Sequence, residues 1–258
     1  MKERLSIVKI GGNVIDDPEK LDSFLKDFSR LPGKKILVHG GGKEATRLSG
    51  VLGIETVKID GRRVTDRATL DVVTMVYAGL INKNIVVALQ KEGVDAMGFT
   101  GADGNLIPAT RRPAIPVDYG FVGDIDTEKI GTRRIASMLE EEIVPVFCAI
   151  CHDREGTLLN CNADTIAGSL AVAMAREYDV SLVYCFEKAG VLMDIDDDES
   201  VIAEVTADNF DELKATGVVA EGMLPKLENA LTSVAKGVSE VRICHFSAVS
   251  ADKGTVIR

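Results

Sequence analysis

Short apolar runs rich in valine and isoleucine alternate along this 258-residue chain with longer segments of helical periodicity. A parallel β-strand needs a crossover, usually a helix, before the next strand can join it, so this alternation is typical of a mostly parallel sheet covered by helices. The sequence therefore predicts an α/β protein. Strands are expected at 5–10, 34–39, 143–150, 180–186 and 240–245. Helices are expected at 18–30, 43–51, 66–92, 131–141, 164–177, 207–215 and 222–236.

The segment 95–128 breaks this rhythm. It is rich in Gly, Pro and Asp, with the strings GADGN and DYGFVGDID between short extended pieces, which predicts antiparallel hairpins on one edge of the sheet. No internal repeat and no low-complexity linker is present, so two lobes would have to share one continuous sheet. We expect their boundary near residue 178.

Charge and hydropathy limit the partners that this chain can have. Forty acidic against 30 basic residues give a net charge near −10, which argues against broad binding of nucleic acid or anionic membranes. The N-terminal MKERLSIVKIGG lacks the apolar core of a signal peptide, and no apolar run is expected to reach transmembrane length. We therefore expect a cytoplasmic protein with no membrane partner.

The chain has five cysteines, and two of them lie in the string CAICH, which runs from Cys148 to His152. Its C-x-x-C-H spacing is that of covalent haem attachment, and C-x-x-C by itself is also found in redox and zinc sites. However, the string overlaps the apolar run IVPVFCAI and has no partner C-x-x-C elsewhere in the chain. We therefore interpret these cysteines as reduced thiols of a buried strand and predict no metal site.

Glycine clusters follow two of the expected strands: VKIGGN contains Gly11 and Gly12, and LVHGGGKEA contains Gly40, Gly41 and Gly42. At the carboxyl end of a parallel strand, glycines let backbone N–H groups approach an anion. Tight turns also need glycine for steric reasons, so one cluster alone would be weak evidence. Neither cluster fits the P-loop or the dinucleotide-binding fingerprint. Two clusters predict a phosphate or carboxylate site at this edge.

Three further features carry potential chemistry. Lys9 lies in an apolar strand, where a lysine is costly unless its ammonium emerges at the strand end or meets an anion, and we favour a phosphate contact. Asn160 and Asn162 precede Asp164 at the start of an apolar helix, where Asp164 is expected as the N-cap and the amides could hold a carboxyl group. Lys226, taken by itself, predicts only a solvated helix face.

In this order, the motifs resemble the amino acid kinase family, and within it the acetylglutamate kinases of arginine biosynthesis. The resemblance extends almost end to end and is carried by KIGG at 9–12, VHGGG at 38–42, GRRVTD at 61–66, FTGADG at 99–104, GFVGDI at 120–125, NCNAD at 160–164 and EGMLPK at 221–226. It implies a three-layer αβα fold around an open, mostly parallel sheet. It also implies a homodimer that phosphorylates the γ-carboxylate of N-acetyl-L-glutamate with ATP. Residues 1–177 would bind the acylglutamate and dimerise, and residues 178–258 would bind ATP.

The resemblance also assigns roles to residues. The two transition-state lysines fall on Lys9 and Lys226, and the aspartate that organises them falls on Asp164. Substrate-binding positions fall on Gly41, Gly42, Arg63 and Asn160. Nucleotide-binding positions fall on Lys9, Gly12, Glu187 and Lys226. Magnesium would be carried by the ATP phosphates rather than held in a protein cage.

The chain departs from the family pattern at three places. FEKAGV, with Phe186 and Glu187, replaces a hydroxyl-containing turn near the nucleotide, and Lys43 and Arg62 add cations near the acyl end. These cations suggest N-succinyl-L-glutamate as an alternative substrate, although both could be solvated surface charges. A non-catalytic regulatory module with the same fold, and a kinase for another small acid, are further alternatives.

Overall fold

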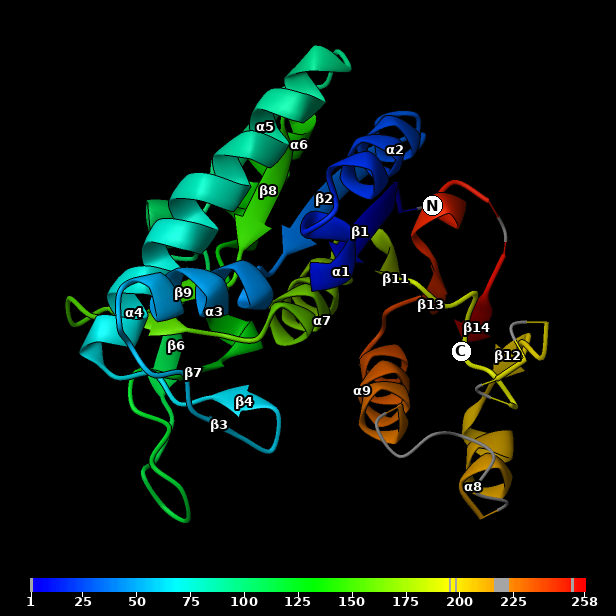
Figure 1. Cartoon of the computed structure of the whole chain (residues 1–258). Coiled ribbons are helices and arrows are strands. Elements are labelled where there is room, and N and C mark those ends of the chain that lie inside the picture. Colours follow the sequence, from blue (N-terminus) through cyan, green and yellow to red (C-terminus); the bar gives the residue numbers. More distant parts are fainter. Residues whose placement is uncertain (1, 195, 198, 216–222, 252) are drawn as a thin grey trace.

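An eight-stranded sheet forms the centre of the computed structural model, which describes residues 2–194, 196–197, 199–215, 223–251 and 253–258 (Figure 1). Neighbouring strands pair in parallel except for one antiparallel pair, β13 with β14. The strand order and bounds are β12 (Glu204–Val205), β14 (Thr255–Ile257), β13 (Glu240–His245), β11 (Asp179–Phe186), β1 (Arg4–Ile10), β2 (Lys34–His39), β8 (Val144–Cys148) and β5 (Ala96–Phe99). The predicted α/β class and mostly parallel open sheet are therefore confirmed.

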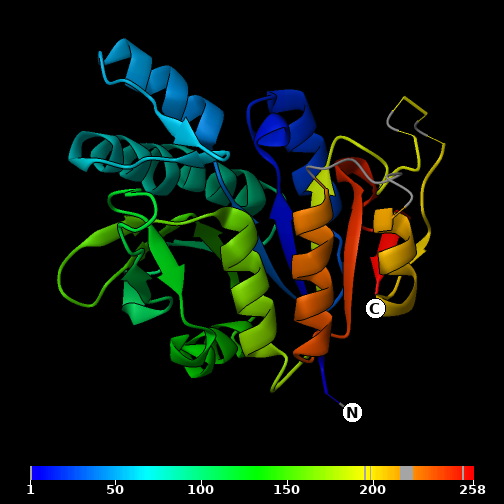
Figure 2. The same ribbon diagram turned by 90° about the horizontal axis from the view of Figure 1, so that it is seen from below.

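Helices cover both faces of this sheet. On one face α7 (Ala163–Met174) packs on β1 and β11, and α9 (Leu224–Ala235) lies beside it against β13 (Figure 2). On the other face α2 (Pro18–Ser29) packs against α5 (Asn82–Lys91). The remaining helices are α1 (Gly12–Ile15), α3 (Gly42–Val51), α4 (Arg67–Thr74), α6 (Thr132–Glu140) and α8 (Ala207–Ala215), with 3-10 turns at Asp103–Asn105, Thr127–Lys129 and Phe246–Ala248. The three-layer αβα architecture is as predicted.

The boundary expected near residue 178 falls inside this continuous sheet. Strand β1 pairs in parallel with β2 on one side and with β11 on the other, so the last strands of the chain extend the sheet built by the first. The sharing of one sheet is confirmed. The division of labour between residues 1–177 and 178–258 stays a prediction.

Two predicted segments differ in detail. The run 143–150 is not one strand: β8 ends at Cys148, and β9 (Ile150–His152) pairs antiparallel with β10 (Leu158–Asn160) in a separate two-stranded sheet. Within 95–128, β6 (Ala109–Arg111) and β7 (Gly123–Ile125) form the expected hairpin, but β5 is a parallel edge strand of the main sheet. Partner choice, which a local pattern does not encode, decides both cases.

One helix passes the length and hydropathy test for a membrane span, contrary to the sequence expectation. It runs without a break over Arg67–Lys91, and an 18-residue window within it has a mean hydropathy of 1.7, with 44% of that window buried inside the protein. Its first and last parts are α4 and α5, and its middle, Met75–Ile81 (η1), is π-helical. Buried residues of η1 include Tyr77 and Ile81. Core packing therefore explains the apolar residues on the buried side of this helix.

All five cysteines are buried and free, and Cys148 and Cys151 lie in β8 and β9. Burial raises the pKa of the Cys148 thiol to about 12. A thiol with such a pKa stays protonated at neutral pH, which makes it a poor nucleophile and a poor metal ligand. The interpretation of CAICH as strand residues is therefore supported by the structure.

A buried histidine connects the long helix to the sheet just below the second glycine cluster. The Nδ1–H of His39 donates to the Gly40 carbonyl at 2.8 Å, and Nε2 accepts from the Asn82 amide at 3.0 Å. The same amide nitrogen also donates to the Val146 carbonyl of β8 at 2.9 Å. Because both ring nitrogens are used in this way, the neutral imidazole fits the network and the cation does not.

We expect this network to make stability depend on pH. Burial lowers the pKa of His39 to about 4, whereas an unfolded histidine titrates near 6.5. Between these values the unfolded state binds the proton better, so stability is complete above pH 6.5 and falls as pH decreases toward 4, by roughly 3 kcal/mol in total. Urea unfolding at pH 7.0 and 4.5 measures this loss. A His39→Asn variant should lose less stability over the same interval, whereas the half-buried His152→Gln should behave like the wild type.

Candidate active site

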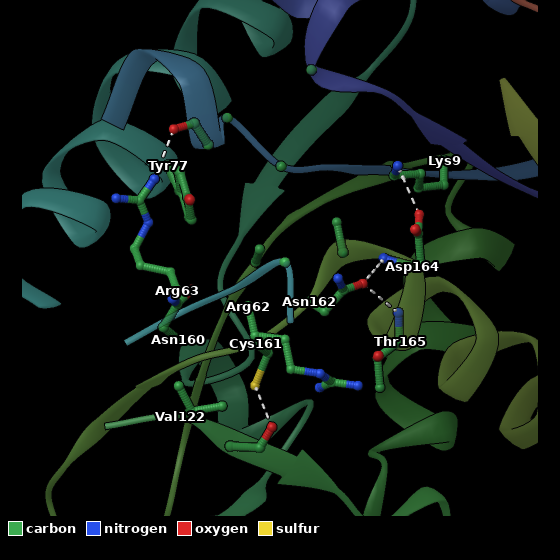
Figure 3. Close-up of a pocket in the computed structure, with 18 of the residues that line it drawn as sticks. Lys9, Arg62, Arg63, Tyr77, Val122, Asn160, Cys161, Asn162, Asp164 and Thr165 are labelled. Atoms are coloured by element: carbon green, nitrogen blue, oxygen red, sulfur yellow. Dashed lines mark hydrogen bonds and ion pairs between the residues drawn. The ribbon is translucent and has the colours of Figure 1, made fainter. Parts of the chain in front are cut away.

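The carboxyl ends of three parallel strands meet at one edge of the sheet. The register pairs Ile10 of β1 with His39 of β2, and His39 with Cys148 of β8. Both glycine clusters therefore leave the sheet side by side, as expected for parallel strands. They border a cavity of about 250 Å³ that is lined by residues from the sheet edge, the N-terminus of α7 and two hairpins (Figure 3).

Lys9 and Asp164 form an ion pair at this edge. Lys9 is the penultimate residue of β1 and 8% exposed, and its Nζ lies 2.7 Å from Oδ1 of Asp164. Asp164 is the second residue of α7, where the helix dipole favours a carboxylate. Its backbone carbonyl accepts a hydrogen bond from the Tyr184 hydroxyl at 3.2 Å. The carboxylate therefore compensates the buried ammonium and orients it toward the cavity (Figure 3).

Asp164 is not the N-cap of α7, contrary to the sequence expectation. The cap is Asn162, whose Oδ1 accepts from the backbone N–H of Asp164 at 2.8 Å and of Thr165 at 3.2 Å. Because the amide satisfies the orphan N–H groups of the helix, the carboxylate of Asp164 is free to pair with Lys9.

Lys226 lies close to this pair, although it comes from near the other end of the chain. It is the third residue of α9, 217 positions after Lys9, and its Nζ lies 4.0 Å from the centroid of the Phe186 ring. The Nζ of Lys9 lies 5.1 Å from the same centroid. Burial lowers the pKa of Lys226, the Asp164 carboxylate opposes this shift and the Lys9 ammonium adds to it. The expected start of its helix at Gly222 lies outside the described residues.

Phe186 is a site residue that the sequence identified only as a departure from the family pattern. It ends β11, and its ring attracts both ammonium groups through its π-face while shielding them from water. The parallel pairing of β1 with β11 sets Lys9 opposite Tyr184, two residues before Phe186. An aromatic residue at the carboxyl end of a strand next to the Lys9 strand was the available signal.

Arg63 enters the cavity from a short hairpin. Strands β3 (Lys58–Ile59) and β4 (Arg62–Arg63) are joined by Asp60 and Gly61, both with positive φ, which is the two-residue turn typical of Asp-Gly. Successive strand residues point to opposite sides, so Arg62 and Arg63 diverge (Figure 3). The Asp-Gly pair could have predicted this hairpin from the sequence.

The guanidinium of Arg63 is buried against neutral oxygen atoms. Nη2 donates to the Gly42 carbonyl and to Thr46 Oγ1, each at 2.8 Å, and Nη1 donates to Thr56 Oγ1 at 3.1 Å. It is 8% exposed and forms no ion pair within the described part of the chain. A buried cation without a protein anion is costly, which favours an anionic ligand at this position.

Gly41 allows the backbone to pass close to the π-helical segment. Its φ is 149°, and a Cβ at this position would lie 2.2 Å from Ile81 Cδ1 and 3.1 Å from Tyr77 Cδ1. Gly41 is also the N-cap of α3, a ten-residue helix, and both Gly41 and the first helical residue Gly42 line the cavity. Only glycine combines this conformation with this close approach. The other predicted substrate position, Asn160, ends β10 and donates from Nδ2 to Thr65 Oγ1 at 3.0 Å.

The predicted nucleotide positions are only partly brought together. Gly12 lines the cavity with Lys9. Glu187 instead accepts from Lys20 Nζ at 2.7 Å and from the Asn13 amide, and both contacts lower the pKa of its carboxyl. Its role in nucleotide binding stays a prediction.

Known proteins resemble this chain over its full length. The amino acid kinase family matches residues 4–245. The acetylglutamate kinase of Phocaeicola vulgatus is 52% identical over 258 residues, which cover 100% of both chains, and that of Cytophaga hutchinsonii is 52% identical over 96% of this chain and 93% of its own. Among solved structures, smu.665 from Streptococcus mutans superposes with a TM-score of 0.77 at 28% identity and 98% coverage of both chains. The chain therefore belongs to the amino acid kinase family.

Proposed function

We propose that this chain transfers the γ-phosphoryl group of ATP to the γ-carboxylate of N-acetyl-L-glutamate, a step of arginine biosynthesis. The observation that carries the proposal is the convergence of Lys9, Asp164 and Lys226 beside a cavity that Lys9, Arg63 and Asp164 line; Lys226 lines the neighbouring cavity, which also includes Asp164. The names of relatives that are about half identical over the full chain support the same substrate.

The reaction depends more on stabilisation of the transition state by positive charge than on covalent catalysis. Phosphoryl transfer passes through a loose transition state in which charge spreads over the equatorial and leaving oxygens. In this proposal Lys9 and Lys226 neutralise that charge from two sides, while Asp164 holds Lys9 in place. A γ-carboxylate with a pKa near 4.3 is already ionised at pH 7, so the attacking oxygen needs no general base.

Binding of the acylglutamate is assigned to the N-terminal part. Every residue that lines the cavity precedes residue 178, which supports residues 1–177 as the acylglutamate lobe. Arg63 would bind the α-carboxylate as a planar fork, Asn160 the acylamide, and the N–H groups of Gly41 and Gly42 the γ-carboxylate. The C-terminal part would bind ATP beside Phe186 and Lys226.

Magnesium would arrive with the nucleotide. No group of three or more His, Cys, Asp or Glu side chains suited to a metal occurs among the residues that the structure describes. The charged side chains that line the cavity are cationic apart from Asp164, which fits a metal coordinated by the phosphate oxygens of ATP. When bound, the ion would screen the charge of the β- and γ-phosphates.

We further propose that the protein is a cytoplasmic homodimer. Met75, Leu80 and Val87 on the long helix are 54%, 48% and 69% exposed, and a second copy could cover them. Analytical ultracentrifugation measures this state, and a monomer at micromolar concentration would contradict it.

Trapping of the acyl phosphate with hydroxylamine tests the proposed activity. With ATP, Mg²⁺ and N-acetyl-L-glutamate we expect hydroxamate to accumulate in proportion to enzyme. A non-catalytic regulatory module with the same fold would bind these ligands without product. Absence of ATP-dependent hydroxamate with any acylglutamate would reject the proposed kinase activity.

Replacing Arg63 by lysine should weaken acylglutamate binding specifically. Lysine keeps the charge but loses the planar fork that contacts Gly42 and Thr46, so KM for N-acetyl-L-glutamate should rise about 10- to 100-fold while KM for ATP changes little. The matched control is Arg47→Lys, because Arg47 pairs with Glu44 on the exposed side of α3. Equal effects of the two substitutions would contradict the assignment.

A further inference from the structure

Among the described residues, the cavity has more unpaired cationic side chains than the two carboxylates of N-acetyl-L-glutamate would neutralise. Its lining includes one carboxylate, Asp164, and five cationic side chains: Lys9, Lys58, Arg62, Arg63 and Arg112. Lys9 pairs with Asp164, and Arg112 pairs with Asp124 through Nε at 3.1 Å. The side chains of Arg62 and Lys58 form no hydrogen bond or ion pair within the part of the chain that the structure describes.

Arg62 and Lys58 both belong to the β3–β4 hairpin. Lys58 is paired directly with Arg63 and lies on the same face of the hairpin, whereas Arg62 lies on the opposite face. Arg62 follows the Asp-Gly turn and extends from the hairpin past Cys161 toward Asn162 and Thr165 (Figure 3). It also borders a second cavity of about 260 Å³ between α7 and α9. A wall of Val122, Gly123 and Cys161 lies beside it. A ligand chain leaving the Arg63 region would therefore pass an apolar wall and reach a guanidinium without a partner.

The second cation suggested by the sequence, Lys43, is in a different place. Lys43 lies on α3 and, with Asp16 and Glu44, lines a hollow outside this cavity. Burial raises the pKa of Asp16, and the charge of Lys43 acts in the opposite direction. It is therefore not part of the acyl end. Of the two added cations only Arg62 lines the substrate cavity, and the structure adds Lys58 to it.

The cations of the cavity outnumber the anions that an acetylated ligand would bring. The γ-carboxylate of an acylglutamate would face Lys9 and Lys226, and its α-carboxylate would face Arg63. An acetyl group is neutral and has nothing to offer Arg62 or Lys58, whereas a guanidinium at a cavity wall is well suited to a bidentate carboxylate. We infer that the acyl group carries a carboxylate of its own, as in N-succinyl-L-glutamate, and that Arg62 binds it. This inference rests on the proposed function.

A comparison of three acyl groups distinguishes the effect of the acyl group's charge from the effect of its length. The hydroxamate assay should be run with N-succinyl-, N-butyryl- and N-acetyl-L-glutamate, because butyryl matches the four-carbon chain of succinyl but lacks its charge. We expect kcat/KM for the succinyl substrate to exceed that for the butyryl substrate by at least about tenfold, the effect of one charge-assisted hydrogen bond. A preference for acetyl or butyryl would overturn the inference and leave the kinase activity intact. No product from any of the three would reject both.

Two variants test whether Arg62 determines the preference for the succinyl substrate. Arg62→Leu should lower the ratio of succinyl to acetyl kcat/KM by about 10- to 100-fold. Lys43→Gln, which removes a cation outside the cavity, should leave the ratio at its wild-type value. If Arg62→Leu raises KM for ATP equally with both acyl substrates, Arg62 serves the nucleotide and the inference is wrong. Matching circular dichroism melting curves show that the variants fold.

Discussion

Replacing Lys9 by alanine is expected to lower kcat by about 100- to 1,000-fold, the usual cost of removing one preorganised donor from a developing oxyanion. Lys9 is held firmly at the sheet edge, because β1 lies inside the sheet and the Asp164 carboxylate pairs with its ammonium at 2.7 Å. If this ammonium contacts the transferring group mainly in the transition state, kcat and kcat/KM should fall together.

The fold should survive this substitution, because the Asp164 carboxylate that loses its partner is 30% exposed and can be hydrated. Steady-state kinetics with hydroxylamine trapping and a thermal melt of the same sample separate the two effects. The control is Lys26→Ala, which removes an exposed partner of Asp22 on α2 and should leave kcat at the wild-type value. Near-normal turnover of the Lys9 variant would reject the mechanism.

Lys226→Ala is expected to cause a loss of similar size, about 100- to 1,000-fold in kcat, although nothing in the local sequence marks this residue. The side chain is held over the Phe186 ring at 4.0 Å, next to Lys9, in an environment whose burial lowers the pKa of Lys226. If both lysines act on the same phosphoryl charge, the double variant should lose less than the product of the two single losses.

The matched control for this residue is Lys214→Ala. Lys214 lies in the last turn of α8 and pairs with Glu228 of α9 at 3.0 Å on the exposed side, so its removal changes the charge near the same helix without touching Phe186. A rise in KM for ATP at constant kcat in Lys226→Ala would indicate that Lys226 only binds the nucleotide. That outcome would contradict its role in the transition state.

Most of the fold could be predicted from the sequence because its signals are local. Valine- and isoleucine-rich runs identified β1, β2, β11 and β13, and apolar periodicity identified the main helices. The end of the strand at Cys148 and the parallel pairing of β5 could not be predicted in this way, since both depend on which strand becomes the neighbour. The π-helical turn at Met75–Ile81 was not predicted either. This segment places Tyr77 and Ile81 against Gly41, a tertiary contact that the periodicity of a single helix does not reveal.

The features of the candidate site can likewise be separated into those predicted from the sequence and those seen only in the structure. Sequence alone determined that glycines and Lys9 lie at the carboxyl edge of a parallel sheet, because strand direction places those residues there. Only the tertiary structure decided that Asn162 caps α7, that Phe186 carries two ammonium groups, and that Arg62 lines the cavity whereas Lys43 does not. These contacts join side chains from elements far apart in the chain. Their distances are set by how helices and hairpins pack, and no local pattern records this packing.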